Sequence, residues 1–86
     1  FTLIYTTVKT KELDKDSLKK LGARIRTLRI KAGYSSQETF SYECQIPRAQ
    51  YARYEKGSNI TFLSLQKIVK FHKMTWKEFF SEGFDD

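Results

Sequence analysis

Residues 36–57, SQETFSYECQIPRAQYARYEKG, decide how this chain folds. Their pattern predicts two short helices, at about 36–43 and 47–56, joined by a tight turn at residues 44–46. Ser35 or Ser36 suits the cap of the first helix. A proline suits the first turn of the second, and a glycine follows its end.

The second predicted helix has two different faces. Helical spacing turns Arg48, Gln50 and Arg53 outward and Tyr51 and Tyr54 inward. Two short helices whose second member presents basic and amide side chains have the layout of a helix-turn-helix, in which that member enters the major groove of duplex DNA. The tyrosines could instead stack on bases, but stacking requires splayed single strands, so we expect them in the core.

A longer helix is expected ahead of this motif, from Ser17 to about Ala32. Asp16 is a good N-cap candidate, and Gly33 suits the left-handed position that ends a helix. Apolar residues recur at three- and four-residue steps and predict one buried face: Leu18, Leu21, Ile25, Leu28 and Ala32. Basic residues are expected on the opposite faces: Lys19, Lys20, Arg24, Arg26 and Lys31.

Two further helices are expected after the motif. One begins at Thr61 and turns its apolar residues inward: Leu65, Ile68 and Val69. The other begins at Thr75, whose pairing with Glu78 fits a capping box. We expect it to bury the phenylalanines that follow: Phe79, Phe80 and Phe84. The prediction is an all-α, compact five-helix domain.

The ends of the chain differ from this domain in composition. Residues 1–10, FTLIYTTVKT, favour an extended arm, and residues 11–16 are expected to form a charged linker. The helical domain is assigned to residues 17–84 and an acidic tail to residues 85–86. The first ten residues show no signal-peptide pattern, and with a single cysteine we expect a cytoplasmic protein.

Positive charge is concentrated on the predicted motif and the helix before it. The chain of 86 residues has a net charge of +6 and an isoelectric point near 9.6. Residues 18–57 hold nine Lys and Arg against three Glu, so they carry the same +6. Such a one-sided distribution is typical of nucleic-acid binders.

Other chemistries find little support. Cys44 is the only cysteine and His72 the only histidine, so neither a disulfide nor a zinc site is expected, and no cofactor is implied. No catalytic triad or acid pair is apparent, and we expect no enzymatic activity. The longest apolar run is too short to cross a bilayer, and no helix offers a broad exposed apolar face for a membrane surface.

Five pieces of sequence carry a family likeness: RIRTLR at 24–29, GYSSQ at 33–37, PRAQYARYEKG at 47–57, LQKIVK at 65–70 and MTWKEFF at 74–80. Together they resemble the lambda-repressor-like (Cro-type, XRE-type) helix-turn-helix regulators, and FFSEGF at 79–84 resembles members found in Bacteroidetes. The resemblance covers residues 18–84. It implies a five-helix domain that binds double-stranded DNA and regulates transcription, expected to be a repressor and a homodimer on a palindromic site.

The resemblance also implies roles for individual residues. Base reading falls to Arg48, Ala49 and Arg53, since arginine pairs with guanine and alanine can meet a thymine methyl group. Contacts to the DNA backbone are expected from Gln37, Gln50, Lys56, Ser58 and Asn59. Arg29 and Glu55 are expected to form a structural ion pair between the long helix and the second motif helix. The alternative for each polar residue is ordinary solvated surface.

The chain departs from the family pattern at four places. One residue is inserted between Gly33 and Gln37, Gln45 replaces the usual turn glycine, Pro47 replaces a Ser or Thr cap, and His72 stands where leucine is usual. Gln45 must therefore adopt a positive φ or form a different turn.

A protein-interaction module, such as an antitoxin-like helix-turn-helix, remains the second hypothesis. The N-terminal segment 1–8 favours it, because an extended strand can pair with the sheet edge of a partner. The dimer surface could be this segment or the last helix with Phe80 and Phe84.

Overall fold

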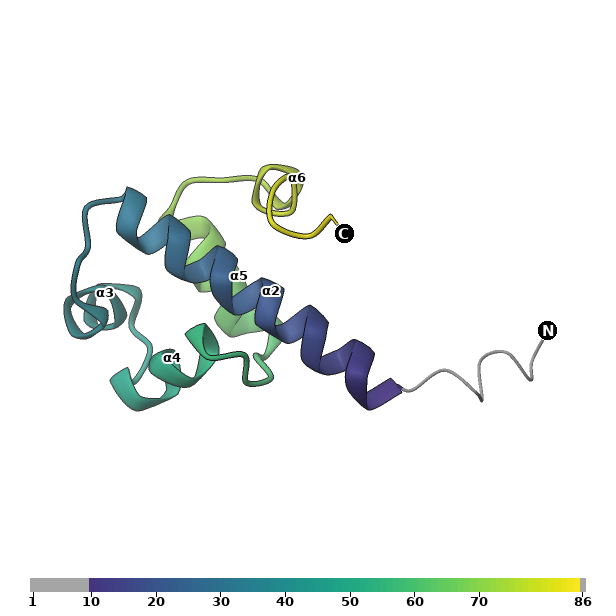
Figure 1. Ribbon diagram of the computed structural model, residues 1–86. Coiled ribbons are helices and arrows are strands. Elements are labelled where there is room, and N and C mark those ends of the chain that lie inside the picture. The colour runs from purple at the N-terminus through teal and green to yellow at the C-terminus, as the bar shows by residue number, and fades with distance from the viewer. Residues whose placement is uncertain (1–9, 86) are drawn as a thin grey trace.

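The computed structural model describes residues 10–85, and the side chains from residue 15 onward. Within this range the chain forms five α-helices and no strand, in the order α2 (Thr10–Lys31), α3 (Gln37–Cys44), α4 (Arg48–Glu55), α5 (Phe62–Phe71) and α6 (Trp76–Phe79). The long helix α2 runs through the middle of the domain, with α3 and α4 on one side and α6 on the other (Figure 1). The all-α prediction is confirmed, whereas the extended arm falls largely on residues 1–9, outside the described range.

Helix α2 begins earlier than the sequence indicated. It starts at Thr10 and not at Ser17, so Asp16 lies inside the helix and is not its N-cap. Residues 11–16 lack an apolar stripe, but they contain no glycine or proline, and nothing in their chemistry interrupts a helix. The end was predicted correctly: Gly33 has a φ of 93°, and the amide of Tyr34 donates to the carbonyl of Arg29, which closes a Schellman motif.

The segment between α3 and α4 is a tight turn at an unusual residue. Ser36 caps α3 by accepting bonds from the amides of Glu38 and Thr39. Gln45 adopts the left-handed conformation, with φ 61° and ψ 44°. The ammonium of Lys67 in α5 donates to the carbonyl of Gln45 over 3.2 Å, which holds this turn against the domain. Pro47 lies one position before α4, at its N-cap, and not in its first turn.

The last two helices begin as the sequence predicted. Thr61 caps α5 by accepting from the amide of Ser64, and Thr75 and Glu78 form a complete capping box at α6. Helix α6 is a short helix of one turn, Trp76–Phe79. Phe80 follows it and lies outside the helix. Phe80 is 46 % exposed, so the expectation that it is buried was wrong.

One hydrophobic core joins all five helices. Its fully buried members are Ile25 from α2, Phe40 from α3, Tyr51 from α4, Ile68 from α5 and Phe79 from α6. The predicted inward positions of Leu28, Cys44, Tyr54, Leu65 and Val69 are confirmed. Ala32 is exposed instead, since it lies in the turn that ends α2. The core therefore packs against the inner face of α4 and leaves the outer face of this helix exposed.

His72 is half-buried at the end of α5. Its ring stacks on Phe40 with centroids 5.4 Å apart, and its Nε2 is buried without a hydrogen-bond partner. Burial, together with the charge of Arg24, lowers the pKa of His72 below its ordinary value. Its place beside Phe40 therefore favours the neutral form of the imidazole.

Candidate nucleic-acid interface

Helix α4 is set on α2 by an unusually close backbone crossing. A Cβ on Gly22 would lie 2.6 Å from the carbonyl oxygen of Glu55 and 2.7 Å from that of Tyr54. Only glycine allows the two helices to approach this closely. Gly22 therefore sets how closely α2 and α4 pack. This role was not predicted from the sequence, although an isolated glycine inside a helical pattern is a known signal of close packing.

The carboxylate of Glu55 organises the polar contacts beneath α4. Its side chain is 3 % exposed and that of Arg29 is 5 % exposed. Arg29 donates from Nε to Oε2 over 2.7 Å and from Nη2 to Oε1 over 3.3 Å. Gln37 donates to Oε1 over 2.8 Å, and the hydroxyl of Tyr51 donates to Oε2. The geometry supports the predicted Arg29–Glu55 ion pair.

The ionisation of this cluster follows from its contacts. Burial alone would raise the pKa of Glu55, but the hydrogen bonds from Arg29, Tyr51 and Gln37 outweigh it, and the pKa lies below its ordinary value. The bond to Glu55 raises the pKa of Arg29. Both groups are therefore charged at neutral pH, and their charges compensate each other inside the domain.

The outer face of α4 is basic. Glu55 is the only acid in α4, and it is directed inward. Arg48, Ala49 and Arg53 are all exposed, as is Lys56 just after the helix. In the part of the chain that the structure describes, the guanidinium groups of Arg48 and Arg53 have no hydrogen bond and no ion pair. This surface therefore offers cationic donors that no described protein group uses.

The helical repeat sets how these side chains are distributed. Ala49 and Arg53 are four residues apart and Lys56 follows three residues later, so all three share one side of α4. Arg48 lies five residues before Arg53, which is about 140° around the axis at 3.6 residues per turn. The two arginines are thus expected to reach different parts of a groove and not the same base pair.

Two of the predicted backbone contacts have partners inside the protein. The Nε2 of Gln37 donates to Glu55, and that of Gln50 donates to the hydroxyl of Tyr54. The side-chain amide nitrogen of glutamine carries two hydrogens, so Gln37 and Gln50 could each still donate one hydrogen bond to a phosphate. The contact of either residue with DNA stays a prediction.

The loop after α4 carries the remaining predicted contacts. Ser58 and Asn59 are exposed, and the amide of Ser58 donates to the carbonyl of Arg53 over 3.0 Å. Gly57 has a φ of 101°, which lets the chain reverse directly after the helix. The loop therefore folds back on the last turn of α4, which carries Arg53.

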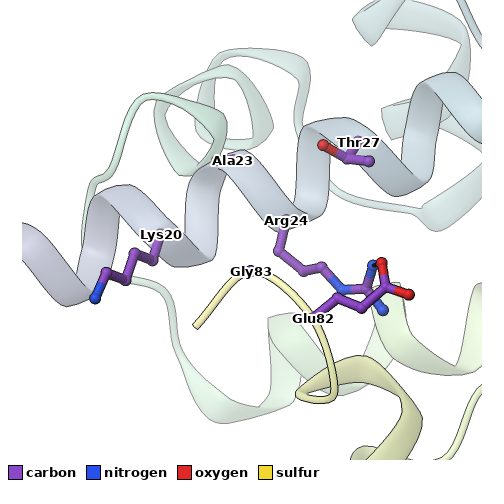
Figure 2. A pocket seen from close by; sticks show the side chains of 6 residues that line it. All are labelled: Lys20, Ala23, Arg24, Thr27, Glu82 and Gly83. Atoms are coloured by element: carbon purple, nitrogen blue, oxygen red, sulfur yellow. Dashed lines mark ion pairs between the residues drawn. The ribbon is translucent and has the colours of Figure 1, made fainter. Parts of the chain in front are cut away.

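Arg24 was expected on a solvated face, but its side chain is buried. It is 6 % exposed, and it donates from Nε to the carbonyl of Phe79 over 2.8 Å and from Nη2 to that of Glu78 over 3.0 Å. Figure 2 shows its guanidinium turned toward Glu82, at 3.6 Å, with Gly83 alongside. Arg24 thus ties α6 and the C-terminal turn to α2, which excludes it from a nucleic-acid surface.

The thiol of Cys44 is also buried. Cys44 is 6 % exposed, and burial raises its pKa to about 12, so it stays protonated at neutral pH. Among the described residues no three His, Cys, Asp or Glu side chains are grouped to hold a metal ion. None of the helices described is both long enough and apolar enough to cross a membrane.

A family model described as helix-turn-helix (HTH_3) matches residues 25–79, which is more than half of the chain. The match begins inside α2 and ends in α6, so it includes α3, α4 and the loop that follows. No curated protein matches the sequence, and no solved structure does so.

Proposed function

This chain belongs to the helix-turn-helix family of DNA-binding regulators, and from that premise we propose that it binds specific duplex sequences by placing α4 in the major groove. The observation that carries the proposal is the asymmetry of α4. Its only acid is buried against Arg29, while Arg48, Arg53 and Lys56 face outward. A groove-reading helix requires such a face, because base edges and phosphates are both read by cationic donors.

We assign the reading of bases to Arg48, Ala49 and Arg53 and the contacts to phosphates to Lys56, Ser58 and Asn59, with Gln37 and Gln50 as further candidates. The exposed arginines support the first group, because a guanidinium can donate two bonds to guanine O6 and N7. The loop position of Ser58 and Asn59 supports the second, since hydroxyl and amide groups commonly donate to phosphate oxygens.

Fluorescence anisotropy with a preferred duplex and single-base variants of it tests these roles. Arg48→Ala is expected to cost about 1–3 kcal/mol at one base pair and to relax the preference there. Lys56→Ala is expected to weaken binding to all duplexes alike. Identical base preferences for the parent, Arg48→Ala and Arg53→Ala would contradict the assignment.

We further propose that the chain forms a homodimer and acts as a repressor. An exposed aromatic surface supports the dimer: Phe62 is 64 % exposed and Phe80 is 46 % exposed. Leu63, next to Phe62 in the sequence, is 68 % exposed. Trp76 stacks between Phe62 and Phe80, with centroids 5.1 and 6.3 Å away. Apolar surface of this kind marks protein contacts. It is formed by α5, α6 and the residue that follows α6, and none of the residues proposed to read bases belongs to it.

The same aromatic surface keeps a protein-interaction module, such as an antitoxin, as the second candidate. Sedimentation equilibrium of the parent and of Phe80→Ser separates the two. A parent dimer that the variant converts to monomer supports self-association through this surface. A monomeric parent that copurifies with one small protein in stoichiometric amounts would support the alternative.

A further inference from the structure

We propose that one edge of α2, formed by Lys15, Lys19 and Arg26, is a second binding surface for the phosphate backbone of duplex DNA. It would contact the strand beyond the bases that α4 reads. The inference rests on the proposed function, because it extends the same interface. Neither the family resemblance nor the match of the family model assigns a role to these three residues.

The backbone contacts between α2 and α4 place this edge beside the proposed interface. Gly22 meets the end of α4, and a Cβ on Gly57 would lie 3.5 Å from the Cα of Lys19. Lys19 thus adjoins the loop that carries Ser58 and Asn59. In Figure 1 the N-terminal half of α2 continues past this loop and away from the rest of the domain.

The helical repeat aligns the three cations. Lys15, Lys19 and Arg26 flank Gly22 at steps of four, three and four residues, so they follow the side of α2 that faces α4. At 1.5 Å per residue, the row from Lys15 to Arg26 is about 16 Å long. Phosphates of one DNA strand follow each other every 3.4 Å along the helix axis, so a row of about this length spans several of them.

These cations are available to a ligand. All three are exposed, and in the part of the chain that the structure describes none of them has an ion pair or a side-chain hydrogen bond. Two acids near this edge whose side chains the structure describes already have partners: Glu55 is paired with Arg29, and Asp16 lies 3.6 Å from Lys20. Among the side chains that the structure describes, no acid is paired with these cations, and Lys19 lies beside Gly57 in the loop that follows α4.

Binding measurements at several salt concentrations test this surface. The variants are Lys19→Gln, Arg26→Gln and the double variant, with Lys77→Gln on the opposite side of the domain as the control for net charge. Each removes one positive charge per substitution from an exposed side chain. Each protein is titrated with its preferred duplex and a scrambled duplex, both in a short form and in a form about five base pairs longer at each end.

Loss of one phosphate contact is expected to reduce the slope of log K against log salt by about 0.9, and affinity at 0.15 M salt by about fivefold. Lys19→Gln and Arg26→Gln should each show this loss on both long duplexes, and the double variant should show about twice the change in slope. The loss should shrink on the short duplex, whereas Lys77→Gln should match the parent. Base preference should not change, since phosphates carry no sequence information.

Two results would overturn the inference, and they are distinguishable. If the parent prefers one duplex and Arg48→Ala relaxes that preference, while both α2 variants bind like Lys77→Gln, the second surface is wrong and the proposed function stands. If the parent binds no duplex with any preference, the proposed function fails and the second surface fails with it.

Discussion

Arg29 of α2 and Glu55 of α4 form a two-point ion pair beneath the proposed reading helix, with Nε–Oε2 at 2.7 Å and Nη2–Oε1 at 3.3 Å. Both side chains are almost fully buried. Because Gln37 and Tyr51 donate to the same carboxylate, this pair connects α2, α3 and α4. The pair fixes the orientation of α4 without adding charge to its outer face.

Removing Arg29 should unfold the domain and not merely weaken DNA binding. Arg29→Ala leaves the Glu55 carboxylate buried without its counter-charge, at an expected cost of about 3–5 kcal/mol. In a domain of this size that corresponds to a drop in melting temperature of more than about 12 °C. Thermal unfolding followed by circular dichroism measures it, with exposed Arg26→Ala as the control. Equal midpoints for Arg29→Ala and the parent would contradict the structural role.

The close crossing at Gly22 predicts that Gly22→Ala destabilises the domain, although alanine has the higher helix propensity. In an exposed helix, Gly→Ala stabilises by about 1 kcal/mol. Here the new methyl group would lie 2.6 Å from the carbonyl oxygen of Glu55 and would force α4 away from α2. Gly22→Ala should therefore lower the free energy of unfolding in urea, whereas Thr27→Ala on the exposed side of α2 should leave it unchanged or raise it. A more stable Gly22→Ala protein would show that the crossing is looser than described.

Arg24 should hold the C-terminal turn in place. Arg24→Met removes the donors to the carbonyls of Phe79 and Glu78, together with the guanidinium carbon that lies over the Phe79 ring, and keeps only part of the apolar stem. The carbonyl of Glu78 keeps the bonds from the amide and hydroxyl of Ser81, but that of Phe79 loses its donor. Leaving a buried carbonyl without a donor costs about 1–3 kcal/mol. Trp76 is the only tryptophan, so its emission should shift to the red as α6 detaches. Emission identical to that of the parent would argue that α6 is held by its phenylalanines alone.

Much of the fold could be predicted from local chemistry. The caps at Ser36, Thr61 and Thr75 and the glycine after α2 were recognisable, because each supplies a group that a helix end needs. The inward positions of Tyr51 and Tyr54 followed from the helical repeat. The start of α2 was misplaced, because residues 11–16 have helix-forming side chains but no apolar pattern.

The missed features depend on contacts between distant parts of the chain. Arg24 is basic and adjoins the apolar stripe of α2, and its burial becomes clear only once α6 places two carbonyls beside it. The engagement of Gln37 with Glu55 likewise depends on how α3 and α4 cross. The predicted base-reading residues are exposed as expected, but their contacts depend on a ligand, so those roles stay predictions.

Stability should fall at acidic pH in two steps with different causes. The pKa of His72 is lowered in the folded state, so the unfolded chain takes up a proton first, and stability should decrease as the pH falls below about 6.5. The pKa of Glu55 is also lowered, so a second decrease is expected below about pH 4.3 as this carboxylate becomes protonated. Urea unfolding at a series of pH values measures both.

A substitution separates the two steps. His72→Leu should flatten the decrease between about pH 7 and 5, because leucine fills the space beside Phe40 and cannot be protonated. The step below pH 4.3 should persist in this variant. If the decrease between pH 7 and 5 is the same in both proteins, His72 is not its cause.

The most direct test of base reading by α4 is a selection of bound duplexes from a random DNA pool by the parent and by Arg48→Ala and Arg53→Ala. If α4 reads bases, the parent should enrich one motif, and each variant should lose preference at a different base pair. A dimer should also give two half-sites spaced by about one helical turn, 10–10.5 base pairs. A parent pool without enrichment, at protein concentrations where binding is saturated, would contradict the claim that α4 reads duplex DNA.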